Sequence, residues 1–389
     1  MLDPYDRKHL KEILMPPEGY VLDYAIGTTY SLDLLALMTA PVAFTIFETE
    51  SDFSKIDLLV LVETLRRYAG RISIFCHAGK IKIPENYNMH LSSLLEGSVF
   101  QVLPSNGDAV FHPKVWVLRY ISESGPVAYR LLCLSRNLTY DRSWDTALVL
   151  DGIVFERQRP IVANQPLSDF IASLPGLLQK GLPEDQQKRI EQMKEEIRRV
   201  KFDLPPGIES VTFHLLGIDN KRGDPISGRI DRMLIISPFL SKGRLDHLVT
   251  IGKECILVSR LDSLQNISPE CLGKFSSRFS LKDDAVFGIE DSLDGLHAKL
   301  YAADSGSEGR IWTGSANATE AAFSKNVEFL VELKGKKNIC GIDALGRVLE
   351  SLKRHPECHQ FFDRPDVINE SFGHGGSPLH PSLSSLIDL

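Results

Sequence analysis

Residues 296–333 read LHAKLYAADSGSEGRIWTGSANATEAAFSKNVEFLVEL and place reactive side chains at the edges of apolar, strand-like runs. His297 and Lys299 lie two residues apart at the start of this stretch, and Ser315 and Asn317 lie two apart after the next apolar run. Side chains two apart on a strand point to the same face. Each pair is therefore expected to meet one ligand together.

The first half of the chain repeats this pattern, and in both copies a carboxylate precedes a third apolar run. The first set is His112, Lys114, Ser135, Asn137 and Asp145, and the second is His297, Lys299, Ser315, Asn317 and Glu328. The gaps from histidine to serine are 23 and 18 residues, and those from serine to carboxylate are 10 and 13. Turns absorb differences of this size easily, so we interpret the two stretches as copies of one constellation.

Two such sets meeting across an approximate two-fold axis would supply the groups that cleave a phosphodiester. One imidazole can attack phosphorus while the other protonates the leaving oxygen, and a carboxylate beside a histidine fixes its tautomer. The lysines and asparagines can hold the phosphoryl oxygens, with Ser135 and Ser315 as further substrate-binding groups. This chemistry calls for no cofactor and no metal, and the sequence lacks the clustered carboxylates of a two-metal nuclease.

Composition narrows the class of protein. A chain of 389 residues is too long for one ordinary core, so two domains or two fused halves are expected. The sequence has no apolar run long enough to span a membrane and no secretory signal, which favours a cytoplasmic location. A formal net charge of −7 gives no general attraction to nucleic acid, so a nucleic-acid substrate would need a local basic groove.

Strand-like and helix-like segments alternate in both halves, which predicts an α/β architecture. Residues 184–202 carry the apolar stripe of an amphipathic helix, and a Pro-Pro pair then breaks the pattern. The predicted organisation is an N-terminal half, a helical and Pro-rich linker, a C-terminal half and an irregular tail. These segments span residues 1–180, 181–208, 209–365 and 366–389 respectively.

The second copy carries a family resemblance. HAKLYAAD at 297–304, followed by GSAN, resembles the H-x-K-x4-D motif of the phospholipase D superfamily, and FHPK, SRN and Asp145 resemble its partner motif. The resemblance implies two pseudo-symmetric α-β-α sandwich halves that complete one active site. It also implies a phosphohistidine intermediate that water or an alcohol resolves, with His112 favoured as nucleophile and His297 as acid.

The first copy departs from this motif at two positions. Arg119 stands where the motif has its aspartate, and Leu134 stands where the second half has Gly314. The motif aspartate is usually supportive in the family, so the departure leaves the chemistry in place.

The substrate is left open by the motifs. The sequence shows no membrane-binding stripe, which favours a nuclease acting on DNA or RNA over a phospholipase or phosphatidyl transferase. A non-catalytic phosphate-binding scaffold is the other alternative. The resemblance extends to bacterial proteins of restriction or antiphage systems, where a helicase or another defence partner would supply the basic track that this acidic chain lacks.

Overall fold

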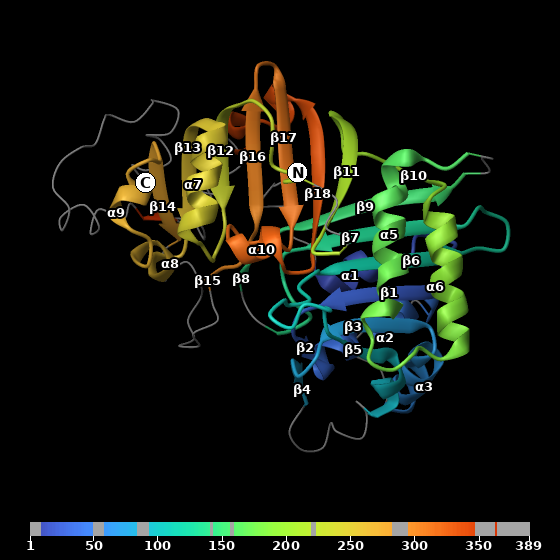
Figure 1. The fold of residues 1–389 in the computed structure, drawn as a ribbon. Helices are drawn as coiled ribbons and strands as arrows, with labels where there is room; N and C mark the ends of the chain where they lie inside the picture. The colour runs from blue at the N-terminus through green and yellow to red at the C-terminus, as the bar shows by residue number, and fades with distance from the viewer. Residues whose placement is uncertain are drawn as a thin grey trace.

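A computed structural model shows two large mixed sheets, each flanked by helices (Figure 1). The structure describes residues 9–49, 58–83, 93–140, 143–155, 159–218, 223–281, 295–346 and 362–363. The expected irregular tail at 366–389 lies outside these residues.

The first sheet has seven strands in the order β10-β9-β7-β6-β1-β3-β5. Its strands are β1 (Val21–Thr29), β3 (Ile72–His77), β5 (Val99–Val102), β6 (Val115–Ile121), β7 (Ala128–Leu134), β9 (Ala147–Val154) and β10 (Val200–Phe202). Strands β1, β3 and β5 are parallel, and β6, β7, β9 and β10 extend the sheet antiparallel from β1. The parallel part joins through helices, as such connections require.

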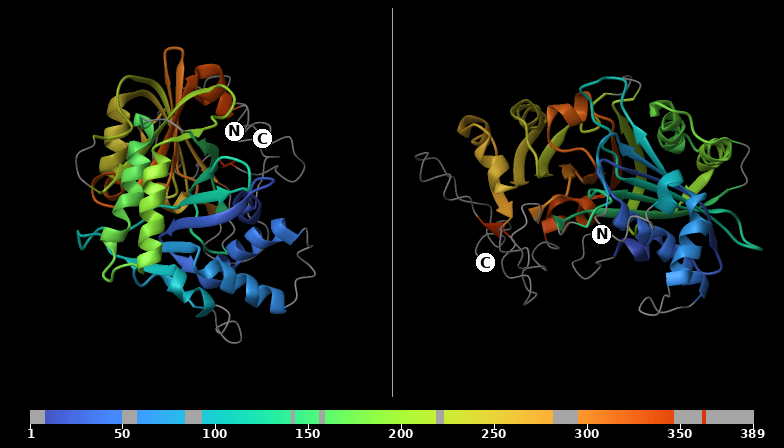
Figure 2. Two further views of the ribbon diagram at one scale, coloured as in Figure 1. Left: turned by 90° about the vertical axis from the view of Figure 1, so that its right-hand side faces the viewer. Right: turned by 90° about the horizontal axis from the view of Figure 1, so that it is seen from below.

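Helices cover both faces of the first sheet. They are α1 (Leu10–Leu14), α2 (Leu34–Thr49), α3 (Leu58–Ala69), α5 (Gln165–Ser173) and α6 (Glu184–Ile197), with short 3-10 turns η3 (Ser93–Ser98), η4 (Val162–Asn164) and η5 (Pro175–Leu177). Buried side chains of α1, α2 and α3 pack on one face, and those of α5 and α6 pack on the other. Figure 2 shows α5 and α6 lying side by side on their face.

The second sheet has eight strands in the order β11-β18-β17-β16-β12-β13-β14-β19. These are β11 (Ile208–Leu216), β12 (Ile230–Ile236), β13 (Gly252–Ser259), β14 (Ser277–Leu281), β16 (Leu300–Ser305), β17 (Glu308–Gly314), β18 (Glu328–Lys336) and β19 (Phe362–Asp363). Its helices are α7 (Lys242–Ile251), α8 (Leu261–Gln265), α9 (Pro269–Leu272), α10 (Glu320–Ser324) and α11 (Lys337–Cys340). Buried side chains of α7, α8 and α9 pack on its outer face.

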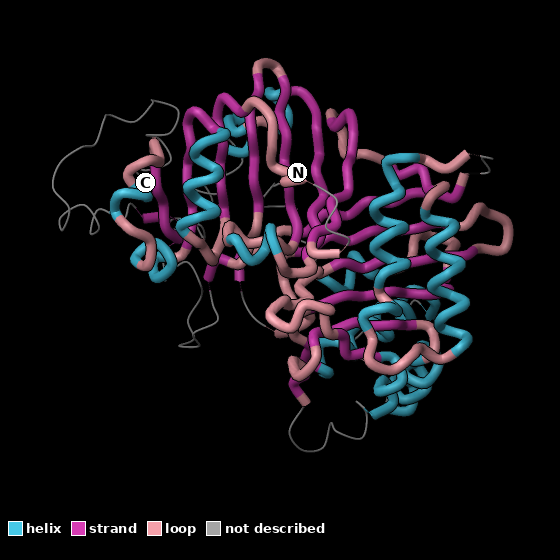
Figure 3. The backbone as a smooth tube through the Cα atoms, in the orientation of Figure 1, coloured by secondary structure: helices cyan, strands magenta, loops and turns pink. Residues whose placement is uncertain are grey.

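The two sheets follow one plan. In the first sheet, β1 pairs parallel with β3 on one side and antiparallel with β6 on the other. In the second sheet, β12 pairs in the same way with β13 and β16. Figure 3 shows the two sheets as separate sets of strands running in different directions. The predicted α/β fold with two related halves is confirmed.

One hydrophobic core joins the halves. The ring centroids of Phe170 on α5 and Phe329 on β18 lie 4.8 Å apart, and those of Phe202 on β10 and Phe213 on β11 lie 5.8 Å apart. The cluster to which all four rings belong includes buried residues of both sheets. Because protein interiors are close-packed, this shared core holds the two halves in a defined relative position.

The segment expected to be a linker belongs to the first half in space. The buried side chains of α6, among them Ile190, Met193 and Ile197, join the common core, and β10 forms the edge strand of the first sheet. The segment at 203–207 then leads into β11 of the second sheet. The domain boundaries given above stay a prediction.

The position of Arg119 shows how the first half replaces the motif aspartate. In the second half, Asp304 is fully buried and lies 3.5 Å from Arg232 and 3.3 Å from Lys337. In the first half, Arg119 is buried and its guanidinium bonds Asp23 at 2.7 Å and Glu196 at 2.8 Å. The ion pairing is thus retained with its charges reversed.

We expect Arg119→Asp to destabilise the protein. The new carboxylate would face Asp23 and Glu196 in a buried site, and breaking a buried pair in this way costs about 3–5 kcal/mol. Denaturant unfolding of the full chain measures the loss. Arg229→Asp is the matched control, because the Arg229 side chain is 78% exposed and its loss should change the free energy of unfolding by less than about 0.5 kcal/mol.

Candidate active site

The backbone segments that carry the two histidines hydrogen-bond to the opposite half of the molecule. The His112 N–H donates to the Val327 carbonyl at 2.9 Å. In the other direction, the N–H groups of His297 and Ala298 both donate to the Trp144 carbonyl, at 3.0 and 2.8 Å. Two short strands, β8 (Ser143–Trp144) and β15 (Gly295–Leu296), pair parallel at this crossing.

These backbone hydrogen bonds between the halves place the motif residues just outside the strands on which we expected them. Strands β6 and β16 begin at Val115 and Leu300, so the histidines and lysines lie just before them and not within them. The serines and asparagines likewise follow β7 and β17 and lie on neither strand. The physical reason is that the backbone here pairs with the other half, and in the first half Pro113 also has no N–H to donate.

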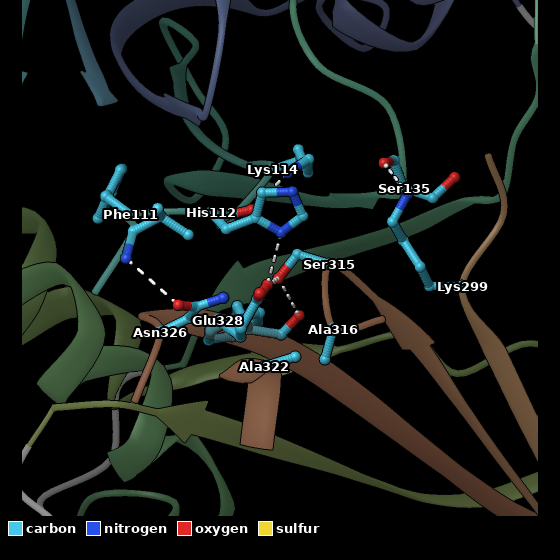
Figure 4. Close-up of polar contacts among 12 residues, drawn as sticks. Phe111, His112, Lys114, Ser135, Lys299, Ser315, Ala316, Ala322, Asn326 and Glu328 are labelled. Atoms are coloured by element: carbon cyan, nitrogen blue, oxygen red, sulfur yellow. Dashed lines mark hydrogen bonds and ion pairs between the residues drawn. The ribbon is translucent and has the colours of Figure 1, made fainter. Parts of the chain in front are cut away.

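Each histidine is hydrogen-bonded to the carboxylate supplied by the other half. His112 Nδ1 lies 2.9 Å from Glu328 Oε2, and His297 Nδ1 lies 3.0 Å from Asp145 Oδ1 (Figure 4 shows the first pair). The exposed fractions of the two imidazoles are 14% and 18%, so a substrate can reach them. The predicted residues therefore come together as two reciprocal pairs, the pattern that an approximate two-fold axis produces.

The two serines hold the carboxylates. Ser135 Oγ donates to Asp145 Oδ1 at 2.7 Å, and Ser315 Oγ donates to Glu328 Oε2 (Figure 4). Ser143, which the motif does not contain, donates to the second oxygen of Asp145 at 2.8 Å. Both motif serines are fully buried. Their expected role in substrate binding is therefore corrected: the geometry makes them positioning residues for the carboxylates.

The two lysines lie beneath the histidines. The ammonium groups of Lys114 and Lys299 donate to the carbonyls of His112 and His297 at 2.7 and 2.6 Å, and both side chains are buried. Burial lowers the pKa of Lys114 well below its ordinary value, the nearby Glu328 carboxylate opposes this shift, and Lys299 adds to it. Two cations held this close in a buried site favour an anionic ligand between them.

The two asparagines keep hydrogen-bonding capacity for a ligand. Within the described part of the chain, the side-chain oxygens of Asn137 and Asn317 are buried and have no hydrogen-bond partner. Buried polar atoms normally find partners. The residue after each asparagine pairs through its backbone with another loop, Leu138 with Leu32 and Ala318 with Leu240. These pairings hold each asparagine just beyond the end of its strand.

Burial keeps both imidazoles neutral at neutral pH. Desolvation lowers the pKa of His112 to about 4, with Glu328 opposing this shift and Lys114 adding to it. Desolvation also lowers the pKa of His297, and the hydrogen bond that His297 donates to Asp145 opposes this shift. Burial acts to raise the pKa of Asp145, but hydrogen bonds from His297, Ser135 and Ser143 outweigh it and leave the pKa lowered. An ionised carboxylate on Nδ1 therefore leaves Nε2 as the nitrogen with a free lone pair.

Gly314 and Leu134 differ because their backbones differ. Gly314 has a φ of +148°, and a Cβ there would lie 2.2 Å from the Phe329 carbonyl oxygen, so only glycine fits. Leu134 instead pairs regularly with Ala147, and its side chain packs with the buried side chains of α1, α2 and α3. The neighbouring serine reaches its carboxylate in both halves, so the substitution leaves the site arrangement unchanged.

Solved structures of another protein have a similar fold. Yeast tyrosyl-DNA phosphodiesterase superposes with a TM-score of 0.52 at 13% sequence identity, covering 84% of this chain and 85% of that one. A histidine-substituted form of the same yeast enzyme gives a TM-score of 0.52 at 14% identity, covering 85% and 86%. That enzyme belongs to the phospholipase D superfamily. The chain has the phospholipase D fold.

The fold assignment rests on the structure. No family model matches the sequence, and no curated protein matches it. At 13% identity the alignment does not transfer an activity. Among the described residues, no group of three or more histidine, cysteine, aspartate or glutamate side chains is arranged to hold a metal ion. No helix within the same ranges combines the length and apolar character of a membrane span.

Proposed function

We propose that this chain is a metal-independent phosphodiesterase that cleaves nucleic acid through a phosphohistidine intermediate. The observation that carries the proposal is the meeting of two histidine–carboxylate pairs, each built from both halves, above two buried lysines. A purely structural histidine needs one partner and no cations beneath it. Here two imidazoles and two ammonium groups come together from both halves, and transfer of a phosphoryl group requires such groups.

In the first step, His112 Nε2 attacks phosphorus and forms an N–P bond while the P–O bond to the leaving group breaks. The leaving oxygen takes a proton from Nε2 of His297, which enters this step in its protonated form. Positive charge develops on the phosphorylated imidazole, and the Glu328 carboxylate on Nδ1 stabilises it. Lys114 and Lys299 stabilise the charge that the equatorial oxygens carry in the transition state.

In the second step, His297 is neutral and acts as a general base. It accepts a proton from water while the water oxygen bonds to phosphorus and the N–P bond breaks, which restores both histidines. Asp145, held by Ser135 and Ser143, stabilises the imidazolium that forms on His297. We assign His112 as the nucleophile because attack requires a neutral imidazole, and burial lowers the pKa of His112 to about 4.

Nucleic acid is the favoured substrate class. Yeast tyrosyl-DNA phosphodiesterase, which has a similar fold, is named for action on DNA, and the partly exposed Tyr30 ring lies beside His112 with the exposed Lys80 next to it. We place the chain in a restriction or antiphage setting, where a helicase or another defence protein supplies a basic track. The alternatives are a phosphatidyl ester substrate and binding of a phosphorylated ligand without turnover.

The proposal is tested by incubating the purified chain with single- and double-stranded DNA and RNA in EDTA. Cleavage of at least one of them without added metal is the expected result. Phosphatidylcholine vesicles and bis(p-nitrophenyl) phosphate are assayed in parallel. Hydrolysis of the lipid with every nucleic acid left intact would replace the nuclease by a phospholipase. The absence of turnover on all of them would leave the phosphate-binding scaffold.

The pH dependence of kcat/KM should be a bell with its maximum on the acid side of neutrality. The reaction needs one neutral and one protonated histidine, and both pKa values are lowered from 6.5. On the acid limb, activity should fall as the pH drops through about 4, because His112 becomes protonated. On the alkaline limb, activity should fall as the pH rises through the pKa of His297, which lies below the ordinary value of 6.5, because His297 loses its proton. Stopped-time assays of bis(p-nitrophenyl) phosphate across this range measure both limbs; a maximum above neutrality contradicts the assignment.

A further inference from the structure

An aromatic–cation cluster lies directly beside His112. The Tyr30 ring centroid is 5.5 Å from that of His112 and 5.4 Å from that of His77. Lys80 Nζ lies 5.6 Å from the centre of the same ring, and Tyr30 is partly exposed while Lys80 is exposed. The catalytic chemistry described above uses neither Tyr30 nor His77 nor Lys80.

His77 ties this cluster to the catalytic segment. Its Nδ1 accepts a hydrogen bond from the Phe111 N–H at 3.2 Å, one residue before His112. The other ring nitrogen then carries the proton. Burial and the nearby Lys80 lower the pKa of His77, so the ring is a neutral donor at neutral pH. Together the cluster offers a π face, a neutral donor and a cation within reach of one another.

The second half has a counterpart in the equivalent loop. Thr29 Oγ1 donates to the Ser31 carbonyl and accepts the Leu138 N–H, at 2.7 and 3.0 Å. In the same way, Ser237 Oγ donates to the Phe239 carbonyl and accepts the Ala318 N–H, at 2.8 and 2.9 Å. These matching bonds identify the loop after β12 as the equivalent of the loop after β1.

Phe239 and Arg260 form the counterpart cluster. Phe239 is 47% exposed, although an ordinary loop would not require a large apolar side chain in solvent. The Arg260 guanidinium carbon lies 6.0 Å from the ring centre, and Arg260 Nε also lies 3.3 Å from Asp262. Arg260 directly follows β13, as the turn that holds Lys80 follows β3.

The two clusters occupy equivalent positions in the two halves. Each loop is bonded to the residue after a site asparagine, Leu138 after Asn137 and Ala318 after Asn317. The axis that relates the two histidine–carboxylate pairs also relates these loops. Ligands of open α/β sheets bind at the carboxyl ends of parallel strands, which is where both clusters lie.

We propose that Tyr30 and Phe239 are stacking positions for unpaired bases on the two sides of the scissile phosphate, with Lys80 and Arg260 on the flanking phosphates. This inference rests on the proposed function and deepens it: the substrate is an internal bond of single-stranded nucleic acid. Aromatic rings beside cations bind unpaired strands in this way, since every base offers a π face and every nucleotide a phosphate. Paired bases in a duplex cannot reach either ring.

The test measures binding separately from turnover. Fluorescence anisotropy of a labelled single-stranded 12-mer and of its duplex is recorded for the full chain carrying His297→Ala, because EDTA does not stop a metal-independent enzyme. Tyr30→Ala and Phe239→Ala should each raise the Kd for the single strand by about 5- to 100-fold. Because the two rings do not touch the same base, the effects should multiply in the double variant.

Phe155→Ala is the matched control. Phe155 is 49% exposed and follows the far end of β9, about 25 Å along the strand from its start at Ala147, the end that lies near Asp145. Its Kd for the single strand should equal that of the wild type. Tyr30→Phe should also retain binding, because the phenyl ring still offers a stacking face.

The outcomes separate the inference from the proposed function. Equal affinity for duplex and single strand, or unchanged Kd in both alanine variants, overturns the inference even where bis(p-nitrophenyl) phosphate is cleaved. Loss in only one variant, with cleavage confined to the terminal phosphodiester, overturns the two-sided arrangement. Strong, ring-dependent binding without any turnover supports the inference and removes the catalytic proposal.

Discussion

His112→Ala and His297→Ala should each reduce cleavage of nucleic acid in EDTA by at least about 10³-fold. One variant loses the nucleophile and the other loses the proton donor, and groups that act as a unit each cost nearly the whole catalytic effect. The double variant should be little worse than either single one. The measurement is the single-turnover rate with enzyme in excess.

His214→Ala is the control for a histidine that makes the same kind of contact elsewhere. His214 Nε2 lies 2.8 Å from Glu332, and its side chain is 19% exposed, close to the value for His297. Glu332 stands four residues beyond Glu328 on β18. This variant should retain the wild-type rate. A comparable loss in His214→Ala would mean that the histidine variants fail through folding.

A substrate with a good leaving group should separate the two catalytic histidines. p-Nitrophenolate leaves without a proton, so His297→Ala should still release one equivalent of it from bis(p-nitrophenyl) phosphate and then stall. His112→Ala should release none, because no N–P bond can form. The stalled His297→Ala protein should carry acid-labile phosphate. A burst from His112→Ala and none from His297→Ala would reverse the roles.

Glu328→Gln and Asp145→Asn should each lower kcat by about 10²- to 10⁴-fold, with little change in KM. An amide keeps the shape of the site but cannot stabilise an imidazolium or enforce its tautomer. Glu328 bonds the histidine of the first half, and Asp145 bonds that of the second. Each carboxylate substitution should therefore impair the histidine of the opposite half.

The pH profile reports this crossing. The Glu328 carboxylate acts to raise the pKa of His112, so Glu328→Gln should move the acid limb of kcat/KM to lower pH. Asp145→Asn removes the groups that raise the pKa of His297 and should move the alkaline limb to lower pH. Glu328→Asp should restore part of the rate. A uniform fall in rate with both limbs unmoved would assign these carboxylates a structural role only.

Periodicity and motif spacing predicted the α/β class, the two related halves and the histidines, lysines, serines and carboxylates that meet at the site. The spacing works because the repeat is carried by short segments whose order along the chain is fixed. What it could not predict was the partner of each carboxylate. Asp145 and Glu328 lie near the serines of their own halves in sequence, and only the crossing segments at His112 and His297 bring each to the opposite histidine.

The serines and the aromatic residues show a second limit. Nothing in S-x-N distinguishes a hydroxyl that binds substrate from one that holds a carboxylate, because both need only a polar group near the site. Tyr30 and Phe239 lie at different positions of equivalent loops, so no sequence repeat marks them. Ser143 was missed for the same reason: it has no counterpart in the second copy.

The crossed pairing also constrains how this chain can change over generations. A substitution at Glu328 removes the hydrogen-bond partner of His112, which lies 216 positions away in the sequence. A substitution at Asp145 likewise removes the partner of His297. Neither half can therefore be inherited, exchanged or repaired independently of the other. Away from these shared pairs the halves differ in charge, as the reversed ion pairs of Arg119 and Asp304 show.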